Sequence, residues 1–110
     1  MTFIENEQRT AKRIALHRPA TLIFKDQHYP VHMTDLSEKG CGFLSPVCLN
    51  DQEEGQLEIS LSTHDEHFTL QLTISVIHCF KTRDSHLVGV IFTHLNAAYR
   101  YALKRIVEEG

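Results

Sequence analysis

Two arginines four positions apart, Arg9 and Arg13, are the residues of this sequence best suited to bind a phosphate or a base edge. A guanidinium group donates two parallel hydrogen bonds, and phosphate oxygens and the O6/N7 edge of guanine both accept such a pair. It also stacks on the faces of planar bases. Lys12 adds positive charge beside Arg13 but lacks the planar fork. On its own, an RxxxR pattern in a polar segment is typical of a solvated charge cluster.

A second polar motif, DLSEKG at residues 35–40, lies where one predicted strand ends and the next begins. Asp35 and Ser37 have short side chains that hydrogen-bond to turn backbone, and Gly40 permits close approach of another chain segment. By itself the motif is typical of an Asx-type turn. As a binding site, it would supply a carboxylate that accepts hydrogen bonds from a guanine edge, with a hydroxyl beside it.

The hydrophobic pattern predicts that short β-strands position these motifs. Apolar and polar residues alternate most cleanly over residues 68–76 and again over 57–62. Further strand candidates lie at residues 20–25, 29–36, 41–45 and 87–92. After Asn96, a predicted N-cap, the period becomes helical, with apolar residues at Tyr99, Ala102, Leu103 and Ile106. About six strands, antiparallel where hairpins join them, and one amphipathic helix favour a small barrel or sandwich.

Taken together and in this order, the two motifs resemble those of the PilZ domain, a bacterial receptor for the second messenger cyclic di-GMP. In that family an RxxxR motif precedes the first strand and a DxSxxG motif follows the second, which is similar to residues 9–13 and 35–40. Gly89 and Phe92 resemble the GxxF pattern of the family's last barrel strand. The resemblance covers nearly the whole chain. It implies an all-β fold, a six-stranded antiparallel β-barrel with an added C-terminal α-helix.

The resemblance also implies the roles of five residues toward cyclic di-GMP, the ligand, with no further cofactor. Arg9 and Arg13 match the motif arginines and are expected to hold guanine and phosphate. Asp35, Ser37 and Gly40 match the DxSxxG positions and are expected to hydrogen-bond the other side of a guanine.

The sequence departs from the family at three secondary candidates. Many members carry a further arginine beside the first motif arginine, whereas Gln8 stands there, and Lys12 partly replaces the charge. Members often carry an aromatic residue, commonly Trp, on the strand that faces the ligand, but this chain has no Trp. His78 stands at the corresponding position, where it either stacks on a guanine or simply ends a strand face.

With 110 residues, the chain fits one domain. We expect a flexible tail at residues 1–8 and one PilZ domain at 9–110. Within the domain we expect a basic arm at 9–18, the β-barrel at 19–93 and the C-terminal helix at 96–109. Pro19 disfavours a helix that continues from the arm.

The net charge of -3 conceals an uneven distribution. Residues 9–18 hold four basic and no acidic side chains, a charge of +4, and the rest of the chain holds 7 basic and 14 acidic ones, a charge of -7. An acidic body disfavours long nucleic acids and anionic membranes as partners. The compact basic segment instead suits a dinucleotide with two phosphates.

No apolar run approaches the roughly 18 residues that span a bilayer, and the acidic N-terminus lacks the features of a signal peptide. We therefore expect a cytoplasmic protein without membrane insertion. Cys41, Cys48 and Cys79 are odd in number and widely spaced, which does not indicate a disulfide framework. Their apolar sequence contexts predict burial.

We expect neither an enzyme nor a metal site. The sequence contains no G-x-S-x-G, P-loop or H-E-x-x-H motif. His64 and His67 flank a predicted hairpin turn at residues 63–66 and are expected to be solvated. A structural zinc site normally shows closer pairs of ligands, such as C-x(2–4)-C.

The predicted function is that of a cyclic di-GMP receptor or adaptor. A dianionic ligand would neutralise Arg9, Lys12 and Arg13 and draw the arm onto the barrel near Asp35 and Ser37. The signal would then pass to an unidentified protein partner. Two alternatives stay open: a degenerate PilZ-like adaptor that binds a protein without nucleotide, and a small barrel that binds single-stranded nucleic acid. The intact motifs disfavour the first, and the acidic body disfavours the second.

Overall fold

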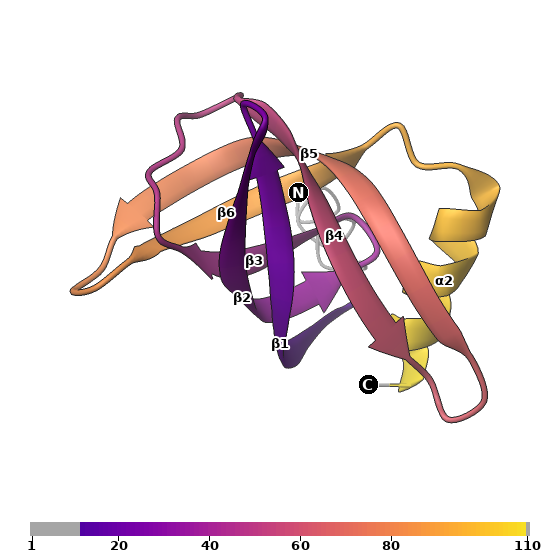
Figure 1. Cartoon of the computed structure of the whole chain (residues 1–110). Coiled ribbons are helices and arrows are strands. Elements are labelled where there is room, and N and C mark those ends of the chain that lie inside the picture. The colour runs from indigo at the N-terminus through magenta and orange to yellow at the C-terminus, as the bar shows by residue number, and fades with distance from the viewer. Residues whose placement is uncertain (1–11, 110) are drawn as a thin grey trace, which may run out of the picture.

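A closed antiparallel barrel with a helix at one end makes up residues 12–109, the part of the chain that the computed structural model describes (Figure 1). The strands are β1 Arg13–Phe24, β2 Gln27–Ser37, β3 Gly40–Ser45, β4 Glu54–Ser62, β5 His67–Lys81 and β6 His86–Thr93, and the helix is α2 Ala97–Glu109. Around the barrel the order is β1-β2-β3-β6-β5-β4, and β4 pairs with β1 to close it. The expected fold class, a six-stranded antiparallel barrel with a C-terminal helix, is confirmed.

The inside of the barrel is apolar because successive side chains of a strand point to opposite faces. In β4, Leu57, Ile59 and Leu61 are buried, and the residues between them are exposed. β5 shows the same alternation from Leu70 to Val76, where every second residue is buried. The alternation predicted for these two segments is therefore confirmed.

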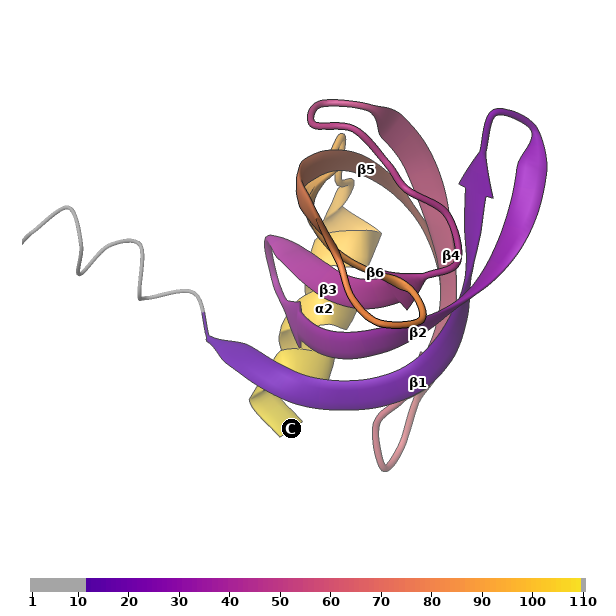
Figure 2. The same ribbon diagram turned by 90° about the vertical axis from the view of Figure 1, so that its left-hand side faces the viewer.

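Helix α2 closes one end of the barrel. Figure 2 looks into the barrel and shows α2 lying across the far opening. Asn96 caps the helix as predicted, because its side-chain Oδ1 accepts a hydrogen bond of 2.8 Å from the backbone N–H of Tyr99. The buried face of the helix joins the apolar core of the barrel through Ala102, Leu103, Ile106 and Val107. None of the helices described here is long and apolar enough to cross a membrane.

The barrel begins earlier than the sequence indicated. Residues 13–18 were expected in the basic arm, but they form the first half of β1. Ile14 explains the difference, because it is buried in the core and pairs with Leu36 of β2. Pro19 is tolerated inside the strand because β4 pairs with β1 only over residues 21–23, so the missing N–H of Pro19 costs no bond to β4. The predicted tail at residues 1–8 lies outside the described residues.

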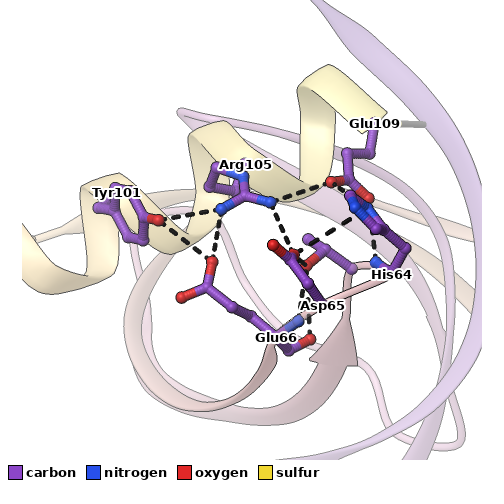
Figure 3. Close-up of polar contacts among 7 residues, drawn as sticks. His64, Asp65, Glu66, Tyr101, Arg105 and Glu109 are labelled. Carbon is purple, nitrogen blue, oxygen red and sulfur yellow. Dashed lines mark hydrogen bonds and ion pairs between the residues drawn. The ribbon is translucent and has the colours of Figure 1, made fainter.

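Arg105 of α2 ties the helix to the turn between β4 and β5 (Figure 3). Its guanidinium donates to Asp65 at 2.9 Å, to Glu66 at 2.5 Å and to Glu109 of its own helix at 3.1 Å. Hydrogen bonds from Thr63 and then Arg105 lower the pKa of Asp65 below its usual 3.8. Arg105 likewise lowers the pKa of Glu109 below its usual 4.5. These charges stabilise the docked helix while both carboxyl groups are ionised.

An Arg105→Met variant should therefore be less stable than the parent at neutral pH, and the difference should shrink in acid. A carboxyl group with a lowered folded-state pKa adds stability above its unfolded pKa and loses it as the pH falls through the folded value. The difference in thermal midpoint should accordingly narrow as the pH falls from about 5 to below 4, through the usual carboxyl range. Thermal unfolding over this pH series measures it. Arg100→Met, on the same helix, is the matched control, and a difference that stays constant with pH would contradict the argument.

Candidate functional site

Four residues lie in one row across the outside of the barrel, one on each of four neighbouring strands. Asp35 of β2 pairs with Gly42 of β3, which pairs with Gly89 of β6. Gly89 in turn pairs with His78 of β5. The row therefore has a carboxylate at one end, an imidazole at the other and two glycines between them.

Local irregularities in the strands point Asp35 and His78 outward. The β2–β3 register shifts between Met33 and Asp35, and the β5–β6 register shifts between Val76 and His78. A bulge adds one residue to a strand and redirects the next side chain. Met33 and Val76 are consequently buried in the core, whereas His78 is exposed and Asp35 is partly exposed.

The two glycines leave room that the neighbouring polar side chains use. A Cβ atom at Gly42 would lie 2.7 Å from Oδ2 of Asp35. A Cβ atom at Gly89 would lie 2.4 Å from two atoms of the His78 ring. The Asp35 carboxylate therefore lies over Gly42, and the His78 imidazole lies over Gly89. The two glycines have no side chains that would separate these groups.

Arg13 completes the polar end of the row. Its guanidinium forms an ion pair with Asp35, and Asp35 also accepts a hydrogen bond of 3.1 Å from the hydroxyl of Thr34. The side chain of Arg13 is 57% exposed and that of Asp35 is 29% exposed, so both can be reached from solvent. The ion pair sets a bidentate donor beside a carboxylate acceptor, the two groups needed to bind a purine edge or a phosphate.

A pocket of about 160 Å³ brings these groups together. Arg13, Asp35, Gly42, His78 and Gly89 all line it. Three apolar strand residues, Leu87, Val88 and Val90, contribute to its wall together with Ile77 and Cys41. The structure thus gathers three of the side chains that the sequence nominated, Arg13, Asp35 and His78, in one concave place.

Phe80 is a candidate that the sequence did not single out. Its ring stacks on His78, with centroids 5.0 Å apart and planes inclined by 26°, and the residue is 59% exposed. The signal was present in the sequence, because Phe80 lies two positions after His78 and hence on the same strand face. A pair of stacked, exposed rings beside a polar pocket suits a planar base.

The remaining DxSxxG residues shape the turn that leads from β2 to β3. Ser37 is buried, its Oγ accepts hydrogen bonds from the N–H groups of Lys39 and Gly40 at 3.1 and 3.2 Å, and its hydroxyl donates to the Gly40 carbonyl at 3.2 Å. A Cβ atom at Gly40 would lie 2.1 Å from the Val90 carbonyl oxygen, so only glycine fits. Direct contact of Ser37 and Gly40 with a ligand stays a prediction.

Three other nominated residues belong to the arm. Arg9 and Gln8 lie outside the described residues. Lys12 is exposed directly before β1. Arg18, the fourth basic residue of the segment, instead directs its guanidinium to the Ser60 carbonyl of β4 at 3.4 Å, away from the pocket.

The cysteines do not share one environment. Burial raises the pKa of the Cys41 thiol well above its usual value, with the charge of Asp35 as a second cause, so this thiol stays protonated. Cys79 is half-buried. The expected burial is wrong for Cys48, which is exposed on the connection between β3 and β4 because that connection lies outside the strand ladder.

Comparisons with known proteins show the family and the fold of this chain. The family model of the PilZ domain matches residues 7–109. A search of curated proteins finds no match. Among solved structures, the Bacillus subtilis inhibitor of motility MotI/DgrA superposes with a TM-score of 0.80 at 12% identity, covering 91% of this chain and 49% of that one.

Two structures of YcgR from Escherichia coli are also similar. Its PilZ domain with c-di-GMP superposes with a TM-score of 0.71 at 16% identity, covering 92% of this chain and 89% of that domain. YcgR in complex with c-di-GMP gives a TM-score of 0.71 at 19% identity, covering 92% of this chain and 45% of that one. The chain thus spans about half the length of MotI/DgrA and of YcgR.

Proposed function

The chain belongs to the PilZ domain family, and from this membership we propose that it is a cyclic di-GMP receptor rather than an enzyme. The observation that carries the proposal is the convergence of Arg13, Asp35 and His78 on one pocket. Two similar structures hold c-di-GMP, as their names state, and one of them is an isolated PilZ domain that this chain covers almost completely.

Each group of the pocket has a role that follows from its chemistry. The Arg13 guanidinium donates to a phosphate or to the O6/N7 edge of a guanine. The Asp35 carboxylate accepts hydrogen bonds from the donor edge of the same base. His78, with Phe80 behind it, offers a ring on which a guanine stacks, and stacking of this kind contributes about 1–3 kcal/mol per base. The buried Ser37 and the tight Gly40 hold the turn in place.

The N-terminal arm, residues 8–12, would change its conformation when the ligand binds. Arg9, with Gln8 and Lys12 beside it, would close over the ligand once the phosphates neutralise the repulsion among the basic residues. New charge-assisted hydrogen bonds that order a segment are a common switching device. The closed arm would then present a changed surface to a downstream protein partner. A receptor for an intracellular second messenger works in the cytoplasm, so the proposal keeps the expected location.

Titration calorimetry of the full chain with cyclic di-GMP tests this function. We expect saturable binding that weakens as salt is added, because salt screens phosphate contacts, and no binding of a short single-stranded RNA. Absence of heat with cyclic di-GMP would identify the chain as a degenerate, nucleotide-free adaptor. Equal binding of the RNA would identify a general single-strand binder instead.

A further inference from the structure

Two cysteines and a histidine gather at the end of the barrel opposite α2. Cys48 comes from the β3–β4 connection, Cys79 from the end of β5 and His86 from the start of β6. The two sulfur atoms and an imidazole nitrogen all lie within 4.8 Å of one another. Figures 1 and 2 show the β3–β4 connection and the β5–β6 hairpin meeting at this end, away from the helix.

We propose that Cys48, Cys79 and His86 form a zinc site that fastens the β3–β4 connection to the β5–β6 hairpin. Tetrahedral Zn²⁺, with Zn–S near 2.3 Å and Zn–N near 2.0–2.1 Å, places its ligand atoms about 3.5–3.8 Å apart. Since no two of the ligand atoms are more than 4.8 Å apart, the cluster needs to contract by about 1 Å at most. Cys48 can supply that movement because it is exposed on a connection.

The other two ligands are held in place by the sheet. Cys79 pairs with Val88, and Lys81 pairs with His86, so Cys79 and His86 lie diagonally across one antiparallel ladder. Cys79 packs against the hydrophobic core, whereas its neighbour His78 is exposed. The zinc site and the proposed nucleotide site thus use opposite faces of β5, and neither depends on the other.

The ligand set selects the class of metal. Two thiolates and one imidazole suit Zn²⁺, whereas Mg²⁺ and Ca²⁺ require oxygen ligands. Three protein ligands leave the fourth position for water or another ligand. Zn²⁺ binds the thiolate form of cysteine, so binding must release protons from the two thiols. Affinity should consequently increase with pH.

A second cluster, His64, Asp65 and Glu109, has comparable spacing but a different environment. Arg105 donates to Asp65 at 2.9 Å and to Glu109 at 3.1 Å, so a fixed cation already occupies oxygen atoms that a metal ion would need. This cluster therefore serves as an internal comparison, because it lacks thiols and its two carboxylates already pair with Arg105.

Titration of the reduced protein with Co²⁺, followed by displacement with Zn²⁺, tests the site. We expect thiolate-to-cobalt charge-transfer absorption and the visible bands of tetrahedral cobalt, both removed by Zn²⁺. Cys48→Ser, Cys79→Ser and His86→Gln should each weaken Zn²⁺ binding by at least about 100-fold, since even outer-sphere changes cost 10–100-fold. Cys41→Ala and His64→Gln are the matched controls and should bind Zn²⁺ with the affinity of the parent.

A thermal measurement provides a second readout. Zn²⁺ should raise the thermal midpoint of the parent but not that of Cys48→Ser, because a ligand that binds only the folded state stabilises it. Cys48 is exposed, so its replacement leaves the fold intact. A cobalt spectrum without thiolate bands, or equal Zn²⁺ affinity in the parent and Cys48→Ser, would overturn the proposal. Cyclic di-GMP binding is measured separately, so failure of either site is distinguishable.

Discussion

An Arg13→Ala variant should bind cyclic di-GMP at least about 100-fold more weakly than the parent, because each hydrogen bond to a charged group contributes about 1.5–3 kcal/mol and the guanidinium can make two. The thermal midpoint of the ligand-free protein should hardly change. The side chain of Arg13 is 57% exposed, and exposed ion pairs contribute only about 0–1 kcal/mol. Asp35 also keeps its hydrogen bond from Thr34. Calorimetric titration and thermal unfolding of the same preparations measure both quantities.

Arg18→Ala is the matched control for this prediction. Arg18 lies on the same strand and carries the same charge, but its guanidinium reaches toward the Ser60 carbonyl of β4. We expect its loss to leave the affinity nearly unchanged at moderate salt, where distant charges are screened. Equal weakening by both variants would show that net charge, and not contact in the pocket, governs binding.

The fold could be predicted from the sequence because apolar and polar residues alternate with a period of two in its strands. Leu57, Ile59 and Leu61 alternate with polar residues, and burial of that face leaves little choice of register. The start of β1 could not be predicted in the same way. Residues 13–18 carry two arginines and a histidine, and they form a strand because they pair with β2, for example through Ile14 and Leu36, which are distant in sequence.

The sequence nominated residues for the candidate site but could not predict how they are arranged. Two motifs nominated Arg13 and Asp35, and the family resemblance nominated His78, yet the bulges that point Asp35 and His78 outward depend on strand pairing. The tight two-residue turn at Lys25 and Asp26 was also not predictable from the sequence. Both residues adopt positive φ angles, of 51° and 63°, although neither is a glycine. The cluster of Cys48, Cys79 and His86 could not be predicted from sequence spacing, because sheet pairing brings together ligands that are distant in sequence.

Two glycine substitutions should have contrasting effects: Gly40→Ala should lower the stability of the fold, and Gly89→Ala should lower the affinity for cyclic di-GMP. In Gly40→Ala, the new Cβ atom would lie 2.1 Å from the backbone oxygen of Val90 and 3.1 Å from Cα of Ile91. Backbone on the neighbouring strand cannot move aside cheaply, so β3 and β6 must separate. We expect a loss of about 2–4 kcal/mol in the free energy of unfolding, and hence a thermal midpoint lower by roughly 10 °C or more.

In Gly89→Ala, the three atoms nearest to the new Cβ atom all belong to the exposed imidazole of His78, the closest at 2.4 Å. That side chain can rotate away, so the cost in stability should stay below about 1 kcal/mol. The ring would, however, leave the pocket, and the affinity for cyclic di-GMP should fall roughly tenfold or more, the value of one stacking contact. Thermal unfolding and calorimetric titration of both glycine variants measure the contrast.

A double-mutant cycle decides whether the binding loss in Gly89→Ala acts through His78. If it does, His78→Ala alone should weaken binding to a similar extent, and the double variant should bind no more weakly than either single variant, because contacting residues are not additive. Additive losses would mean that Gly89 itself contacts the ligand. Unchanged affinity in both single variants would remove His78 from the proposed site.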